Sequence, residues 1–393
     1  MAKKLKIAFL VFPDEFFKNG ELVKSGSIII NEQVIKYLRA NNVEVVEFAP
    51  KNPDRLALRK LTGIGNALMY QDLLNDIESI NLCDAVVTTN YFGSIIPEIK
   101  KPLITIFHHN AKTLLEFLDH EDKIIDLANH LLWKNRAQKY NLAHPTEESV
   151  HDKVVAVLEQ YLIENSQCVV AVSKNLKEEL TDKYSADPRK ITVAPNSISP
   201  EWENISINKN FDSKPLNLTC ITRMPGSAGG FMMKGADRIF EIFLKSNDRM
   251  YQKKLVASTD AKEYQKMIHD YLPKVEYIEN ASHDQVKKIL ANSHITIHCS
   301  RVESFGLTLI ESMLLKNVVI TYPVGVAPDI IENGKNGFIV NNKVEMLKVV
   351  NNLPKRNDLS KIAENAQLTV KEKLSSSQFG KNYLKIITDI ASK

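Results

Sequence analysis

The chain has 393 residues, of which 44% are hydrophobic and 25% charged, and its formal net charge is +4. This length favours two or more domains, and the composition is typical of a soluble globular protein rather than a membrane-spanning one. The net charge is too small for a nucleic-acid-binding surface, so we expect no nucleic-acid partner. The cysteines lie apart, beside apolar runs, which favours buried thiols and a reducing, cytoplasmic location; they are Cys83, Cys168, Cys220 and Cys299.

The N-terminal region begins as a β-α-β unit. The continuous apolar run at residues 6–12 predicts a parallel strand that is covered on both faces. A helix over 27–40 and a strand over 43–48 complete the unit. No Gly-x-Gly-x-x-Gly follows the first strand, so the usual dinucleotide-binding fingerprint is absent there. The sequence therefore disfavours a dehydrogenase.

Residues 51–75 combine basic and apolar side chains at helical spacing. One interpretation is a solvated helix with one face on the core. The alternative is a peripheral contact with the inner face of a membrane, because basic amphipathic helices bind anionic lipid surfaces. The sequence leaves both open, and we expect the helix-rich residues 111–165 to surround an acceptor groove.

Further strands of the first half end in polar side chains. The strand at 102–109 ends in His108 and His109, and the strand at 191–196 ends in Asn196. Functional residues of α/β sheets gather at the carboxyl ends of strands, so the histidines are candidate site residues. Asn196 is equally well explained as a turn residue.

A second α/β unit follows a polar stretch. Residues 199–215 have little periodicity and are rich in Asn, Ser, Lys, Glu and Pro, which predicts a linker. The next strand, 216–222, precedes Arg223 and a glycine-rich loop that reaches Lys234. An arginine fork and a lysine point charge together suit two phosphates, although both side chains are also explained as surface charges.

The most informative stretch is a strand, a turn and a helix within residues 295–314. Apolar residues at near-3.6 spacing predict a helix after Gly306, with Ser304 as its N-cap. Such a turn presents unpaired backbone N–H groups and the positive end of a helix dipole, which bind phosphate well. Glu303 and Glu311 flank the turn with seven residues between them.

This Glu-x7-Glu pattern around Ser-Phe-Gly-Leu resembles the donor-site signature of the retaining family 4 glycosyltransferases (glycosyl transferases group 1) of GT-B fold. The resemblance implies an α/β protein with two Rossmann-like domains that face each other across a cleft. Residues 1–198 would form the acceptor-binding domain and 199–376 the donor-binding domain. A C-terminal helix, 377–393, would cross back to the first domain.

The resemblance also implies roles for single residues. Glu303 would contact the reacting sugar, His108 would support it with His109 as the alternative, and Glu311 would hold the ribose hydroxyls. The other implied donor contacts are Gly26, Arg223, Lys234, Ser304, Phe305, Gly306 and Leu307, with Asn196 and Ile278 as weaker matches.

The implied function is a hexosyltransferase. It would use a UDP- or GDP-sugar donor and a carbohydrate, glycolipid or glycoprotein acceptor. The chain has no Asp-x-Asp, which agrees with a site that needs no metal or other cofactor. A nucleotide-sugar epimerase of the same architecture is a rival, whereas a glycoside hydrolase would need facing carboxylates. A non-catalytic or partner-dependent subunit is the other alternative, because Ser197, Val326 and Asp329 depart from the family pattern.

Overall fold

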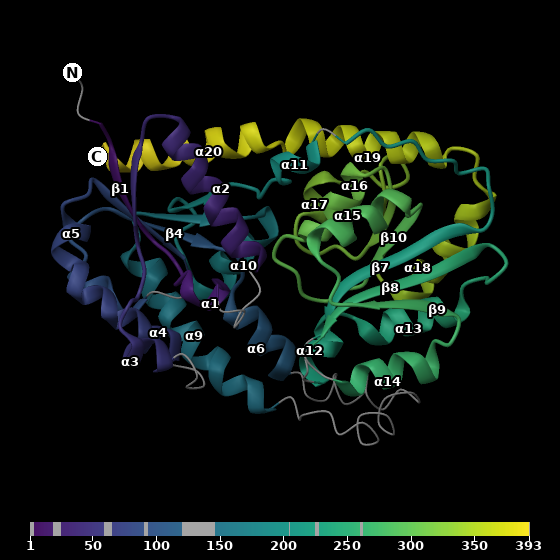
Figure 1. The fold of residues 1–393 in the computed structure, drawn as a ribbon, viewed down its shortest axis with the longest axis horizontal. Helices are drawn as coiled ribbons and strands as arrows, with labels where there is room; N and C mark the ends of the chain where they lie inside the picture. Colours follow the sequence, from purple (N-terminus) through teal and green to yellow (C-terminus); the bar gives the residue numbers. More distant parts are fainter. Residues whose placement is uncertain are drawn as a thin grey trace. The chain divides into compact units, whose positions relative to one another are not determined.

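The computed structural model describes residues 4–18, 25–58, 65–89, 93–119, 146–203, 205–224, 228–259 and 262–392. These residues form two compact units, each built around a six-stranded sheet (Figure 1). The first unit takes its described residues from 4–115, 148–197 and 376–392, and the second from 116–119, 146–147 and 198–375. The predicted α/β class is therefore confirmed.

The first unit has a parallel sheet of order β2-β1-β3-β4-β5-β6. Its strands are β1 (Lys6–Leu10), β2 (Glu44–Phe48), β3 (Ala85–Thr89), β4 (Leu103–Phe107), β5 (Cys168–Ala171) and β6 (Ile191–Val193). Every residue of β3, β4 and β5 is buried, as expected of parallel strands with helices on both faces. The continuous apolar runs in the sequence therefore correspond to the centre of this sheet.

Helices and 3₁₀ turns cover the first sheet. They are α1 (Glu15–Lys18), α2 (Gly26–Ala40), α3 (Pro53–Ala57), α4 (Gly65–Tyr70), η2 (Gln71–Asp76), α5 (Ile77–Asn81), η3 (Gly93–Glu98), α6 (Ala111–Asp119), α9 (Thr146–Asn165), α10 (Lys174–Tyr184) and α20 (Ser376–Ala391). The last helix, α20, packs on α2 through Gly380, where an added Cβ would lie 2.1 Å from the ring of Tyr37. The C-terminal helix is thus part of the first unit.

The second unit has a parallel sheet of order β12-β11-β10-β7-β8-β9. Its strands are β7 (Leu216–Met224), β8 (Tyr251–Thr259), β9 (Val275–Glu279), β10 (Ile295–His298), β11 (Val318–Thr321) and β12 (Phe338–Ile339). Its helices are α11 (Pro200–Glu203), α12 (Ala228–Met233), α13 (Ala236–Lys245), α14 (Lys262–Tyr271), α15 (His283–Asn292), α16 (Leu307–Leu314), α17 (Ala327–Ile330), α18 (Lys343–Asn352), η4 (Leu353–Lys355) and α19 (Leu359–Lys373). Because all paired strands are parallel, their carboxyl ends share one edge of the sheet.

Three expectations about local structure need correction. The predicted linker contains α11, because Trp202 buries all but 2% of its surface and so fixes a helical turn. Arg223 belongs to β7 rather than to the loop after it, because the pairing with β8 continues to Met224. The glycine-rich loop contains α12, where Gly230 accepts a hydrogen bond from the backbone of Lys234.

Some expectations fall partly or wholly outside the described residues. Of the basic segment 51–75, residues 59–64 lie outside them, and of the acceptor-groove segment 111–165, residues 120–145 do. Gly226 of the glycine-rich loop also lies outside them. Within the described part of the chain, no helix has the length and apolar character needed to cross a membrane.

The four cysteines are free thiols, and each of them is buried. This confirms the prediction of core thiols. Burial raises the pKa of the Cys299 thiol to about 12, so this side chain is neutral at physiological pH and packs as an apolar group.

Candidate functional site

The turn between β10 and α16 is organised by a glycine. Gly306 has φ 97° and ψ 64°, a left-handed conformation that residues with a Cβ rarely adopt. It occupies the N-cap position of α16, and its carbonyl accepts a hydrogen bond from Leu309 N at 3.0 Å. The prediction of Ser304 as N-cap was therefore wrong, because the chain reverses at the glycine, two residues later.

A second glycine, Gly325, packs against the backbone of this turn. Gly325 has φ 60°, and an added Cβ would lie 2.4 Å from the carbonyl oxygen of Phe305. The same oxygen accepts a hydrogen bond from Val326 N at 2.9 Å. Only 4% of Phe305 is exposed, so it can offer a ligand its backbone but little of its ring. Gly325 and Val326 thus support the turn through the backbone, and Val326 does so although it departs from the family pattern.

Two predicted donor-site residues meet at this turn. Lys234 Nζ lies 3.0 Å from Glu303 Oε2, with 20% and 30% of the two side chains exposed. The position after the lysine requires glycine, because an added Cβ on Gly235 would lie 1.9 Å from the carbonyl oxygen of Cys299. Gly235 also has φ 69° and caps α13. Close packing against the loop that carries Glu303 therefore explains the glycine directly after Lys234.

An ion pair that the sequence did not reveal fixes this loop. Arg301 makes two hydrogen bonds to Asp237, at 2.6 and 2.7 Å, and only 11% of each side chain is exposed. Arg301 N also donates to Met233 O at 2.8 Å, and its Nη1 donates to Met232 O at 2.7 Å. Bidentate pairs of this kind fix geometry as well as charge. The loop of Glu303 and the turn of Lys234 are thus joined along their backbones.

Glu311 projects from α16 and is paired with a histidine that the sequence analysis did not select. His283 Nε2 lies 3.5 Å from Glu311 Oε1, and its Nδ1 lies 3.9 Å from Glu201. The imidazole also packs on Trp202, with ring centroids 4.8 Å apart. The hydrogen bond to Glu311 is the main cause that raises the pKa of His283 above its usual value. Glu311, with 16% of its side chain exposed, is therefore accessible and has a cationic neighbour below this pKa.

The other two predicted contacts of this unit lie on neighbouring strands. Arg223 is exposed near the carboxyl end of β7 and pairs through its backbone with Ser258. Ile278 is half-buried on β9, the edge strand, opposite Val256. Among the described residues, neither side chain forms an ion pair or a hydrogen bond with the turn of Glu303. Topology alone brings Arg223 to the same edge of the sheet.

The predicted histidine of the first unit also lies at the carboxyl edge of its sheet. His108 follows β4, and its Nε2 lies 3.2 Å from Oδ1 of Asn31 on α2. Burial, and secondarily the charge of His109, lowers the pKa of His108 to about 3. His108 is therefore a neutral imidazole at physiological pH, able to exchange hydrogen bonds but not to supply a charge.

Gly26 and Asn196 occupy different settings. Gly26 is the first residue of α2 rather than a loop residue, and Ser25 precedes it as the N-cap. Asn196 lies after β6 with 4% of its surface exposed, and its Oδ1 has no hydrogen-bond partner among the described residues. The next residue, Ser197, contacts Gln33 of α2 at 3.2 Å. The departure from the family at Ser197 thus adds a contact with α2.

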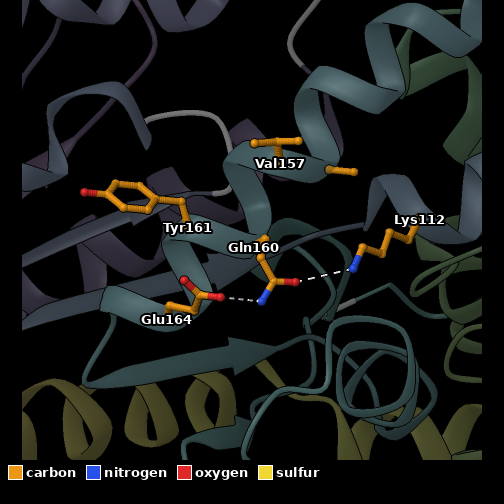
Figure 2. Close-up of a pocket in the computed structure, with 6 residues that line it drawn as sticks. Lys112, Val157, Gln160, Tyr161 and Glu164 are labelled. Carbon is orange, nitrogen blue, oxygen red and sulfur yellow. Dashed lines mark hydrogen bonds between the residues drawn. The ribbon is translucent and has the colours of Figure 1, made fainter.

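The segment after His108 is held by a buried acid and a lysine. Glu159 is fully buried on α9, and it accepts hydrogen bonds from Ala111 N at 2.8 Å and from the hydroxyl of Tyr184. Lys112 donates to Gln160, which in turn donates to Glu164, as Figure 2 shows. These contacts fix the start of α6 three residues after the predicted catalytic histidine.

The fold matches solved GT-B structures. The HepE protein of Anabaena in complex with UDP-glucose has a TM-score of 0.64 and 14% identity, covering 98% of this chain and 100% of that one. A glycosyltransferase of Rickettsia africae has a TM-score of 0.67 and 19% identity, covering 98% of both chains. At these identities the likeness establishes the fold, and it confirms the predicted class of two Rossmann-like sheets.

Two family models match the sequence. Residues 230–367 match the model described as Glycosyl transferases group 1, and residues 29–202 match the model described as Glycosyltransferase Family 4. Two regions of this chain thus match glycosyltransferase family models, and its fold is that of GT-B structures. The group 1 region contains the turn of Glu303 and its partner Lys234, whereas the family 4 region contains His108.

A curated relative is the phosphatidylinositol N-acetylglucosaminyltransferase GPI3 subunit of Saccharomyces cerevisiae. It is 24% identical over 187 residues, which cover 44% of this chain and 39% of the yeast protein. The match thus spans about two fifths of the length of that relative.

Proposed function

We propose that this chain transfers a hexosyl group from a nucleotide-sugar donor to a hydroxyl of a carbohydrate, glycolipid or glycoprotein acceptor, with retention of configuration and without a metal. The contact that carries the proposal is the Lys234–Glu303 pair at 3.0 Å, beside the N-terminus of α16. A cation, a carboxylate and the N-terminal end of a helix are the groups that a diphosphate and a sugar need at one place.

In this proposal, the charge of each residue determines which part of the donor it binds. Lys234 and Arg223 neutralise the diphosphate as negative charge develops on the leaving group, and the start of α16 adds its dipole. Glu303 accepts hydrogen bonds from the sugar and stabilises its positive charge, while Glu311 accepts them from the ribose. His108, with a pKa lowered to about 3, binds the sugar as a neutral hydrogen-bonding group.

The donor in this proposal is a UDP- or GDP-sugar. Support for uridine comes from the solved complexes of HepE, which contain UDP-glucose, UDP with glucose, and UDP. The proposed location is cytoplasmic, with residues 51–75 as the segment that would contact the inner face of a membrane when the acceptor is a lipid.

The experiment that tests the function is a thermal-shift screen of the purified chain. UDP, GDP, ADP and their common sugar conjugates are each added with and without EDTA. A ligand that binds only the native state raises the melting temperature by mass action. We expect a shift with one nucleotide that EDTA does not change and that Glu311→Ala removes. No shift with any of them, or a shift that EDTA abolishes, would refute the donor site as proposed.

A second candidate is a transferase subunit that acts only with partners. It is favoured by the name of the yeast relative, which calls that protein a subunit of a phosphatidylinositol N-acetylglucosaminyltransferase. Turnover separates the two candidates. Hydrolysis or transfer of the donor by the purified chain alone supports an independent enzyme, whereas donor binding without any turnover supports the subunit.

A further inference from the structure

In the Lys234–Glu303 ion pair, the two charged groups that a donor would need are bound to each other. The lysine Nζ lies 3.0 Å from a carboxylate oxygen of Glu303, which is within hydrogen-bond distance. The carboxylate weakens the attraction of the lysine for a phosphate, and the lysine weakens the attraction of the carboxylate for the positive charge that develops on a sugar. The pair is partly accessible, since 20% and 30% of the two side chains are exposed.

The backbones on both sides of the pair cannot separate easily. Arg301 N and Nη1 bond to the carbonyl groups of Met233 and Met232, directly before Lys234. Gly235, directly after the lysine, lies against the carbonyl of Cys299, in the loop that leads to Glu303. Any exchange of partners at the pair must therefore occur by rotation of the two side chains, while the loop and the turn stay together.

We propose that Lys234 and Glu303 are each other's counter-ions in the absence of donor, and that the donor diphosphate displaces Glu303 from Lys234. The displaced carboxylate is then available to the sugar. A diphosphate can replace a carboxylate here because it carries more negative charge and more acceptor oxygens, and because lysine is a mobile point charge. This inference rests on the proposed function and adds a coupling between phosphate binding and the release of Glu303.

Because of this coupling, replacing Glu303 should strengthen nucleotide binding, whereas replacing an ordinary binding residue weakens it. Glu303 competes with the phosphates for Lys234, so its neutralisation in Glu303→Gln should tighten the binding of a nucleoside diphosphate. The expected gain is roughly two- to fivefold, the value of one partly exposed ion pair. Turnover of the nucleotide sugar should fall in the same variant, because the carboxylate is lost.

The test is a double-mutant cycle measured by calorimetric titration. The probe is whichever of UDP, GDP and ADP binds the unaltered chain most tightly. Its dissociation constant is measured for the unaltered chain, Glu303→Gln, Lys234→Met and the double variant. The matched control is Glu241→Gln, which removes the same charge from another accessible glutamate of the second unit. Glu241 forms ion pairs with two lysines, Lys245 and Lys343, each at 2.7 Å.

We expect Glu303→Gln to tighten binding two- to fivefold when Lys234 is present and distinctly less in the Lys234→Met background, with no change in the control. An equal gain in both backgrounds would mean simple repulsion between Glu303 and phosphate and would overturn the inference while leaving the proposed function intact. Weaker binding in Glu303→Gln would overturn it too. If none of the three nucleotides binds the unaltered chain, the donor site itself is refuted. If Glu303→Gln does not fold, Glu303→Asp, which withdraws the carboxylate by one methylene, must show the same direction.

Discussion

Asp237→Asn should destabilise the second unit, because it removes one charge from a nearly buried ion pair. Only 11% of Asp237 and 11% of its partner Arg301 are exposed. The asparagine keeps one acceptor oxygen, so the loss is one of two short hydrogen bonds together with the charge that balances the guanidinium. A hydrogen bond to a charged group is worth about 1.5–3 kcal/mol, and breaking a fully buried pair costs about 3–5 kcal/mol. We therefore expect a loss of about 2–3 kcal/mol in the free energy of unfolding.

The assay is urea unfolding followed by tryptophan fluorescence, because the buried Trp202 belongs to the same unit. The matched control is Asp358→Asn, which breaks another two-bond Arg–Asp pair of that unit. There Arg356 and Asp358 keep 38% and 41% of their side chains exposed, so the loss should stay below about 1 kcal/mol. Equal losses in the two variants would refute the reasoning, because burial would then not set the value of the pair.

Three other predictions concern the packing of α20 and two histidines. Gly380→Ala should lower the free energy of unfolding of the first unit by about 1–2 kcal/mol in urea unfolding. The added Cβ would overlap the ring of Tyr37, and this steric cost exceeds the gain in helix propensity from alanine. An unchanged midpoint would contradict this prediction. The pKa of His283 is raised by Glu311, so its contribution to stability is complete below about pH 6.5 and is lost as pH rises through the raised value; His283→Asn should flatten this part of the pH dependence of unfolding, and an unchanged slope would refute the pairing. The pKa of His108 is lowered to about 3, so the unfolded chain binds the extra proton and stability is lost as pH falls below about 6.5; His108→Asn should reduce that acid-side slope, whereas a steeper slope would contradict the assignment.

Much of the fold follows from local pattern. The apolar runs gave the central strands, since parallel strands buried on both faces need uninterrupted apolar residues. The helix after the first strand was predicted over 27–40 and is observed over Gly26–Ala40. The change from β-branched residues to helical spacing predicted the turn of Glu303 between its strand and helix. The family resemblance implied that Lys234 binds the diphosphate and Glu303 the sugar, and these roles stay predictions, although the two side chains lie 3.0 Å apart.

The contacts that complete the site were not predictable in this way. Arg301 and Asp237 are 64 positions apart, and His283 and Glu311 are 28 apart. Each pair meets only because chain crossovers place their strands and helices together, and no local pattern encodes that order. The prediction of Ser304 as the N-cap of α16, in place of the observed Gly306, failed for another reason. A serine three residues before a helical run is a good cap by composition, but the left-handed backbone of a glycine overrides it.

The place of α20 in the first unit affects how the protein is made. The six strands of that unit lie within residues 6–193, but the helix that packs on α2 is translated only after residues 198–375. Phe379 and Tyr383, which are almost fully buried in the finished unit, reach it last. During synthesis, the surface of α2 that receives α20 therefore stays open to solvent and to chaperones until the whole second unit has left the ribosome. The unit that starts first along the chain is the one completed last.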